Sequence, residues 1–149
     1  MHCKTSSPSS MNLLLAAQYN LIITAFDLQT TQVIQEFELS NSQANKIIVS
    51  DNKTFYVPSY SYVFTYEFNS KTPKATQAFV AHDGNVTDLV ISNSLLITCG
   101  DDKKIKLWDK RASSCQTTIN TKSANNAVLF YPEKNNQIIS GDESDYISS

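Results

Sequence analysis

Residues 81–111 contain four side chains whose types and separations allow one continuous chain of hydrogen bonds. Trp108 offers a single N–H donor, and the Thr98 hydroxyl can both donate and accept. His82 has a donor and an acceptor, whereas Asp102 has acceptors alone. We therefore predict a network that runs from Trp to Thr to His to Asp. Because a low dielectric strengthens such bonds, the network predicts a small buried sheet in which an entry loop, an inner strand, a turn and the next strand meet.

The pattern of this segment returns at a fixed period. Residues 43–66 align with residues 85–108 without a gap, at an offset of 42 residues. The apolar triplet Leu89–Ile91 then lies over Ile47–Val49, and the same offset carries Thr98 onto Ser140. A period of about 40–45 residues is typical of four-stranded propeller blades.

The other repeats are degenerate. The gapless alignment places Ser40, Tyr56 and Tyr66 at the positions of His82, Thr98 and Trp108. Phe26-Asp27 repeats the aromatic and acidic pair once more, 40 residues before Tyr66-Glu67. We expect the complete hydrogen-bonded set in one repeat alone.

The apolar runs indicate an all-β fold. They are short, rich in β-branched residues and separated by Asn, Ser, Asp and Lys clusters. Several are nearly continuous, as expected of strands that are covered on both faces. The prediction is a disordered head at 1–10 and a partial propeller over 11–149, with blades at 11–40, 43–80, 85–121 and, incomplete, 124–149.

The repeat period also bears on the extent of the chain. The offset from Trp108 places the next aromatic residue at position 150, one residue after Ser149. About three and a half blades cannot close a ring of four to eight. An open ring exposes strand edges and an apolar face. We therefore expect a truncated gene model, a fragment or half of an assembly, and a chain that is poorly soluble or oligomeric by itself.

Charge and cysteine content argue against several classes of protein. A net charge of −2, from 12 basic and 14 acidic residues, argues against a general nucleic-acid or membrane surface. Basic residues cluster at 103–111, but Asp101, Asp102 and Asp109 lie among or beside them, so we interpret the basic residues as solvated. No segment predicts a signal peptide or a membrane span. Three widely spaced cysteines without a C-x-x-C pair favour a reducing, cytoplasmic location.

The segment does not suggest a reaction. A nucleophilic Thr98 would need a base, an orienting acid and an open site, yet it lies in the apolar run LLITCG. Asp101 and Asp102 could bind a cation, but a tight turn explains them better. The chain has neither a phosphate-binding loop nor paired carboxylates beside a base. We predict that it is not an enzyme and uses no cofactor or metal.

The chain resembles WD-repeat propellers, and several stretches are similar to the G-protein-β-like, lethal-with-Sec-thirteen subunit of TOR kinase complexes. "QANKIIVS" is similar to that family's second-blade opening, "AHDGNVTDL" to its third, and "IKLWDKR" to the strand that follows. "NNAVLFYPEKNNQIISGDESDYI" resembles the next blade. The chain departs from the family at Ala81, where a glycine is usual, at Phe26 and Tyr66 in place of Trp, and at 143–145.

The resemblance implies a seven-bladed scaffold without catalytic activity. It implies a subunit that docks on the kinase domain of TOR, stabilises it and serves TOR growth signalling. Loops held by the network would present the contact surface, and from their positions we name Asp83, Asp101 and Lys103 as candidate partner contacts. Plain solvent exposure is the alternative for each. Another WD-repeat adaptor, such as a ubiquitin-ligase substrate receptor or a Gβ-type signalling subunit, is the alternative for the whole protein.

Overall fold

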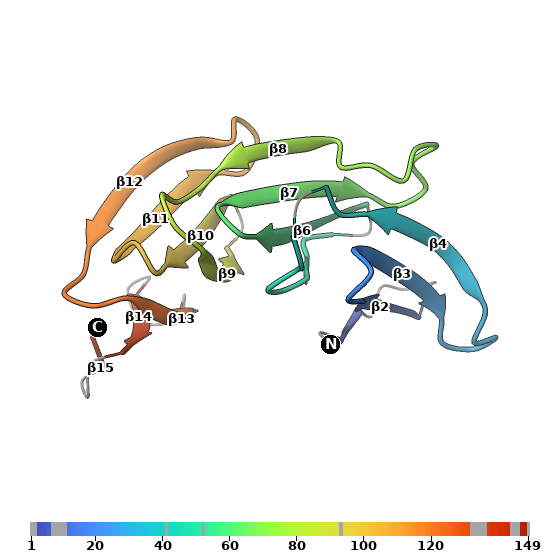
Figure 1. The fold of residues 1–149 in the computed structure, drawn as a ribbon, viewed down its shortest axis with the longest axis horizontal. Coiled ribbons are helices and arrows are strands. Elements are labelled where there is room, and N and C mark those ends of the chain that lie inside the picture. Colours follow the sequence, from blue (N-terminus) through green and yellow to red (C-terminus); the bar gives the residue numbers. More distant parts are fainter. Residues whose placement is uncertain are drawn as a thin grey trace. The chain divides into compact units, whose positions relative to one another are not determined.

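The computed structural model describes residues 3–6, 12–40, 42–51, 53–92, 94–131, 137–143 and 147–148. The regular structure of this part of the chain is entirely β, which confirms the predicted fold class. The described residues contain fifteen strands in four antiparallel sheets, and within each sheet the strands follow one another in chain order (Figure 1).

The first sheet is built from the N-terminal strands. Its strands are β1 (Cys3–Ser6), β2 (Leu13–Ala17), β3 (Ile22–Asp27) and β4 (Val33–Glu38). The predicted disordered head is wrong for Cys3–Ser6, whose backbone pairs with β2 in register Cys3↔Ala16. Pairing with an edge strand needs only backbone groups, so the polar composition of this segment did not reveal it. The rest of the predicted head lies outside the described residues.

The second and third sheets have four strands each. The second contains β5 (Ile48–Val49), β6 (Thr54–Ser59), β7 (Tyr62–Glu67) and β8 (Gln77–Val80). The third contains β9 (Val86–Ile91), β10 (Leu95–Gly100), β11 (Lys104–Asp109) and β12 (Ser114–Asn120). The described part of the fourth has three, β13 (Asn125–Tyr131), β14 (Gln137–Asp142) and β15 (Ile147–Ser148).

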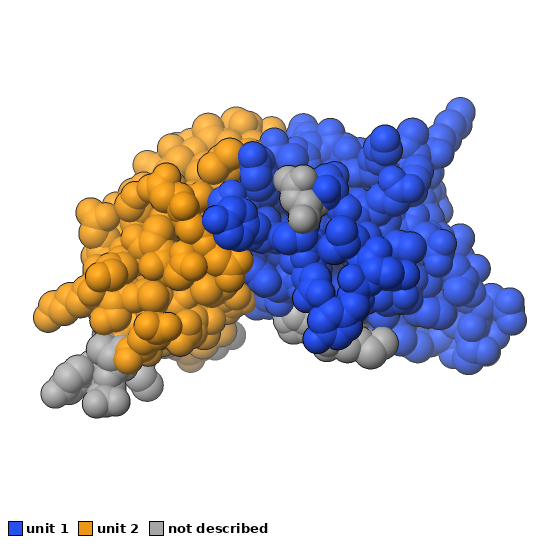
Figure 2. All heavy atoms as spheres, viewed as in Figure 1, with its two compact units in different colours: residues 1–78 blue, residues 79–149 orange. Residues whose placement is uncertain are grey.

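The chain divides into two compact units, residues 1–78 and residues 79–149 (Figure 2). The core of the first unit contains an aromatic cluster among aliphatic side chains: Phe37, Phe55 and Tyr66 are fully buried and Phe68 packs against them. The core described for the second unit is mostly aliphatic and joins the third sheet to the fourth. It is formed by Ile97, Cys99, Ile105 and Val128.

Sheet register corrects the gapless alignment of the second and third sheets. Opposite Trp108 lies Leu96, and opposite the aligned Tyr66 lies Phe55. Strand β6 is therefore displaced by one residue, so the counterpart of Thr98 is Val57 and not Tyr56. The β6–β7 turn is the tighter one, because it follows the pair Ser59↔Tyr62, whereas the β10–β11 turn follows Cys99↔Ile105. Because the β6–β7 turn is shorter than the β10–β11 turn, strands β6 and β7 cannot both lie 42 residues before β10 and β11.

Candidate functional site

The third sheet brings together the four residues of the predicted network, in the predicted order. Trp108 Nε1 donates to Thr98 Oγ1 at 2.9 Å, and Thr98 Oγ1 lies 2.8 Å from His82 Nε2. The other ring nitrogen, His82 Nδ1, lies 2.8 Å from Asp102 Oδ1. Strand β11 supplies the tryptophan, β10 the threonine, the loop before β9 the histidine and the β10–β11 turn the aspartate.

The donors and acceptors fix the direction of the chain. A carboxylate only accepts, so His82 Nδ1 carries the proton and donates to Asp102. His82 Nε2 is then the acceptor for the Thr98 hydroxyl, whose oxygen accepts from Trp108. Each hydrogen-bonding group in this chain has a partner, which makes the neutral histidine the form that fits.

Burial and charge act on His82 in opposite directions. The side chain of His82 is fully buried, and burial lowers its pKa from the ordinary value of 6.5. The hydrogen bond and the charge of Asp102 raise the pKa, but less than burial lowers it, and Lys106 and Lys104 lower it further. The imidazole therefore stays neutral near pH 7.

Asp102 also ties two loops together through their backbone. Its Oδ2 accepts from the Asp83 N–H at 3.2 Å, and its Oδ1 accepts from the Lys104 N–H at 3.2 Å. The neighbouring Asp101 accepts from the Asn85 N–H at 2.7 Å. The loop 81–85 and the turn 100–104 are thereby held as one surface.

Two glycines leave room for this arrangement, and neither was singled out from the sequence. A Cβ at Gly100 would lie 2.9 Å from both the Asn85 carbonyl oxygen and His82 Nδ1. A Cβ at Gly84 would collide with the Asp101 carboxylate. Such clashes depend on the packing of two loops, so the sequence carries no local signal for them.

The three candidate partner contacts lie on these two loops and are exposed. Asp83 is 77% exposed in its side chain and pairs with Lys104 Nζ at 2.7 Å, which lowers the pKa of its carboxyl. Asp101 is also bound to the backbone of the neighbouring loop, as described above. Lys103 has a left-handed backbone with φ of 62° and accepts from the Thr121 N–H.

Trp108 and the residue after it make further contacts. The Trp108 ring packs on Phe79 with centroids 4.8 Å apart, and Lys106 Nζ lies 5.5 Å above it. Lys106 also donates to the Ala81 carbonyl at 2.7 Å. The Asp109 carboxylate accepts from the N–H groups of Arg111 and Ala112, so the acid after the tryptophan closes the β11–β12 turn.

Strand β9 is joined to β13 by side chains that sequence reasoning missed. Asp88 Oδ2 accepts from the Val128 N–H at 2.9 Å, and the Thr87 hydroxyl donates to the Asn125 carbonyl. These bonds connect the third sheet with the fourth inside the second unit. They join residues about 40 positions apart, which a local pattern cannot predict.

The geometry suits a structural role for the network. Thr98 is fully buried, and its hydroxyl is hydrogen-bonded to both Trp108 and His82. Among the described residues, no group of His, Cys, Asp and Glu side chains is arranged to hold a metal ion. The described part of the chain also has no helix long and apolar enough to cross a membrane.

A protein-family model matches the segment that contains this network. The WD domain, G-beta repeat family matches residues 73–109. The chain contains a WD repeat over these residues. The WD repeat thus contains every residue of the network and ends at Asp109, which closes the turn after β11.

Two curated proteins match the chain over most of its length. Target of rapamycin complex subunit wat1 of Schizosaccharomyces pombe is 26% identical, covering 92% of this chain and 44% of the relative. Target of rapamycin complex subunit LST8 of Saccharomyces cerevisiae is 27% identical over 82% of this chain and 41% of its own. The chain thus spans less than half the length of these relatives.

Solved structures show the propeller fold. A chain in a crystal structure of a mitotic checkpoint complex superposes with a TM-score of 0.82 and 17% identity, covering 94% of this chain and 43% of that one. The computationally designed Ika4 protein gives a TM-score of 0.83 and 17% identity, covering 99% of this chain and 87% of that one. At these identities the likeness concerns the fold alone.

Proposed function

We propose that this chain is the propeller portion of a non-catalytic TOR complex subunit, which binds and stabilises the kinase domain in the cytoplasm. The supporting observation is the similarity to wat1 and LST8, which extends over 82–92% of the chain and therefore well beyond the single WD repeat. Fold likeness alone would fit many unrelated adaptors.

The geometry supplies a physical mechanism for docking. Asp102 binds the backbone of both loops, and Asp101 adds a second link, so the exposed groups around them are held in place. A surface that is already ordered loses little conformational entropy on binding. Asp83, Asp101 and Lys103 are exposed on this surface, and we assign all three to partner contact.

Affinity purification of the tagged chain from its own cells, followed by mass spectrometry, tests the proposal. We expect a TOR-type kinase among the captured proteins. Capture of a cullin adaptor without the kinase would instead place the chain among ubiquitin-ligase receptors. A variant with Asp83→Ala and Lys103→Ala should capture less kinase, whereas Lys71→Ala and Lys74→Ala, which change exposed residues of the first unit, should not.

A further inference from the structure

The outer strand of the third sheet is unusual for its exposure and composition. All seven residues of β12, SCQTTIN, are exposed, and the segment contains no charged residue, glycine or proline. β12 is the last strand of its sheet and is hydrogen-bonded there to β11 alone. A long edge strand of this kind presents backbone N–H and C=O groups that can pair with another chain.

The outer strand of the first sheet shows how such an edge can be protected. β4 carries Glu36 and Glu38, and the loop after β7 lies along it. Gln35 bonds that loop through both ends of its amide, donating to the Ser70 carbonyl and accepting from the Asn69 N–H. The Glu38 N–H is used by the Pro73 carbonyl at 2.7 Å. In contrast to β4, β12 has no charged residue of its own.

The charge around β12 indicates the chemistry of its partner. The chain is acidic overall, yet six of its 12 basic residues fall within residues 103–122, with one acidic residue among them. The acidic residue is Asp109, whose carboxylate is bound to backbone N–H groups. Lys104 and Lys106 are engaged by Asp83 and by the Ala81 carbonyl.

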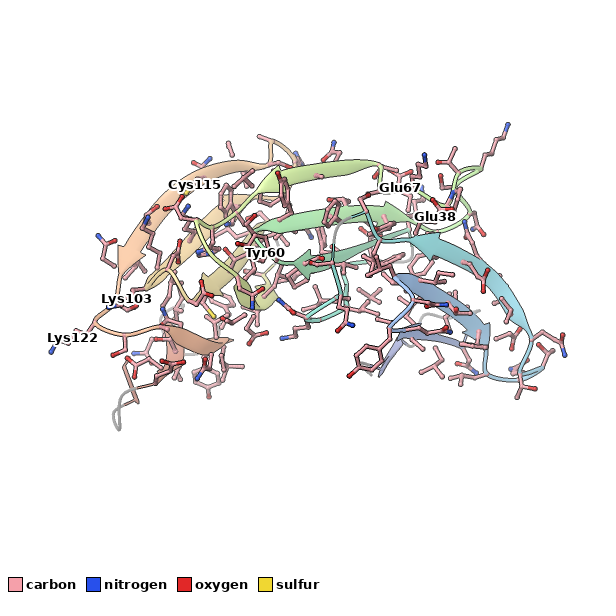
Figure 3. The ribbon with its side chains drawn as sticks, viewed as in Figure 1. Glu38, Tyr60, Glu67, Lys103, Cys115 and Lys122 are labelled. Atoms are coloured by element: carbon pink, nitrogen blue, oxygen red, sulfur yellow. The ribbon has the colours of Figure 1, made fainter. Side chains whose placement is uncertain are left out.

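Three other basic residues of this segment flank the strand. Lys103 and Lys122 are exposed and lie near the end of β12, whereas Cys115 marks its beginning (Figure 3). Arg111 is exposed in the turn that precedes β12. Positive charge therefore stands at both ends of an uncharged edge.

We propose that β12 is a docking site for an extended peptide segment of a partner protein, with an uncharged β-branched centre and acidic flanks. The segment adds to the third sheet as a fifth strand. Its backbone pairs with the open edge, and its acidic flanks meet Arg111 at one end and Lys103 and Lys122 at the other. The site shares Lys103 with the loop surface assigned to the kinase, whereas the backbone edge of residues 114–120 belongs to this site alone, so changes in that edge test this assignment independently.

Fluorescence anisotropy with a labelled peptide, Glu-Glu-Thr-Val-Thr-Val-Thr-Asp-Glu, tests the site on the chain as it stands. We expect saturable binding that weakens as salt is added. Changing Lys103 and Lys122 to Glu should weaken binding by about tenfold or more, since two attractive charges become repulsive. The matched control, Lys71→Glu with Lys74→Glu in the first unit, should bind as the parent does.

Proline variants test the backbone pairing. Successive backbone N–H groups of a strand point to opposite edges, so one of Thr117→Pro and Thr118→Pro removes an outward donor and leaves the β11 ladder intact. The variant that keeps the parental melting temperature should lose about tenfold in peptide affinity. In hydrogen exchange, the peptide should protect the outward-facing amides of residues 114–120, which β11 does not bind.

Four results would overturn the proposal. One is protection of the outward-facing β12 amides in the free chain, and another is parental peptide affinity in the proline variant that keeps the parental melting temperature. The third is a dimer in sedimentation equilibrium that the same variant dissociates, because the edge would then serve a second copy of this chain. Equal affinity for heparin and for the peptide would show a general polyanion surface and would also refute it.

Discussion

The second and third sheets fix the aromatic residue of their third strand in two different ways. In the third, Trp108 on the third strand is fixed by a chain of polar bonds to Thr98, His82 and Asp102. In the second, Tyr66 stands at the position of Trp108 and is fixed by rings. It stacks on Phe55 at 5.1 Å and meets Phe37 edge-on at 5.7 Å.

The polar bonds of the two aromatic residues also differ. The Tyr66 hydroxyl donates to the Glu38 carbonyl at 2.8 Å and so reaches the first sheet, whereas Trp108 donates within its own sheet. Val57, fully buried, replaces the threonine of the network. The second sheet therefore depends on apolar packing between sheets, and the third on polar bonds that also order its loops.

Truncating the two aromatic residues should produce the largest effects. Trp108→Ala and Tyr66→Ala should each cost about 3–5 kcal/mol of unfolding free energy, because each removes a large buried ring. Circular dichroism should follow the urea unfolding of both variants, because Trp108→Ala removes the chain's single tryptophan and tryptophan fluorescence is then lost. Only Trp108→Ala should also speed hydrogen exchange in the loop 81–85. Equal hydrogen exchange of the loop 81–85 in both variants would contradict the conclusion that the polar network of the third sheet orders this loop.

The next largest losses of unfolding free energy should come from exchanging Thr98 of the third sheet and Val57, its counterpart in the second sheet. Thr98→Val leaves the Trp108 N–H and His82 Nε2 without partners, which should cost about 2–4 kcal/mol in total. The reverse change, Val57→Thr, buries a hydroxyl in an apolar core and should cost about 1–3 kcal/mol. If Thr98→Val were neutral in urea unfolding, the network would contribute nothing that packing does not.

The network could be predicted from sequence because donor and acceptor counts are properties of residue types. The register of the second sheet could not, since it depends on the length of the turn after Ser59. The pairing of Cys3–Ser6 uses backbone groups, which every sequence has. The bond from Asp88 to Val128 joins two strands whose approach only the tertiary structure determines.

Gly100→Ala should destabilise the third sheet by about 1–3 kcal/mol, because the added methyl group must displace His82 or the Asn85 carbonyl. Tryptophan fluorescence during urea unfolding reports this sheet directly. Gly141 is the matched control, since a Cβ there meets nothing within 4 Å. Similar losses for Gly100→Ala and Gly141→Ala would point to backbone entropy and away from the predicted clash.

Tyr66→Phe should cost about 1 kcal/mol, the net value of one hydrogen bond, because the ring and its stacking remain. The free energy of urea unfolding, measured by circular dichroism, checks this. Ionisation offers a second check, since burial raises the pKa of Tyr66 to about 12. In a spectroscopic titration, loss of the most alkaline tyrosine transition in Tyr66→Phe is expected. An unchanged titration would contradict the buried position of the hydroxyl.

The smallest expected effect is a pH dependence that belongs to the third sheet alone. Burial lowers the pKa of His82 below its ordinary value of 6.5, so the unfolded chain binds the proton more tightly than the folded chain. The stability that this residue contributes is therefore complete above pH 6.5 and falls as the pH drops toward the folded pKa. The difference in unfolding free energy between the parent and His82→Gln, followed by tryptophan fluorescence, should shrink from pH 7 to pH 5. Parallel curves would mean that His82 is equally basic in both states.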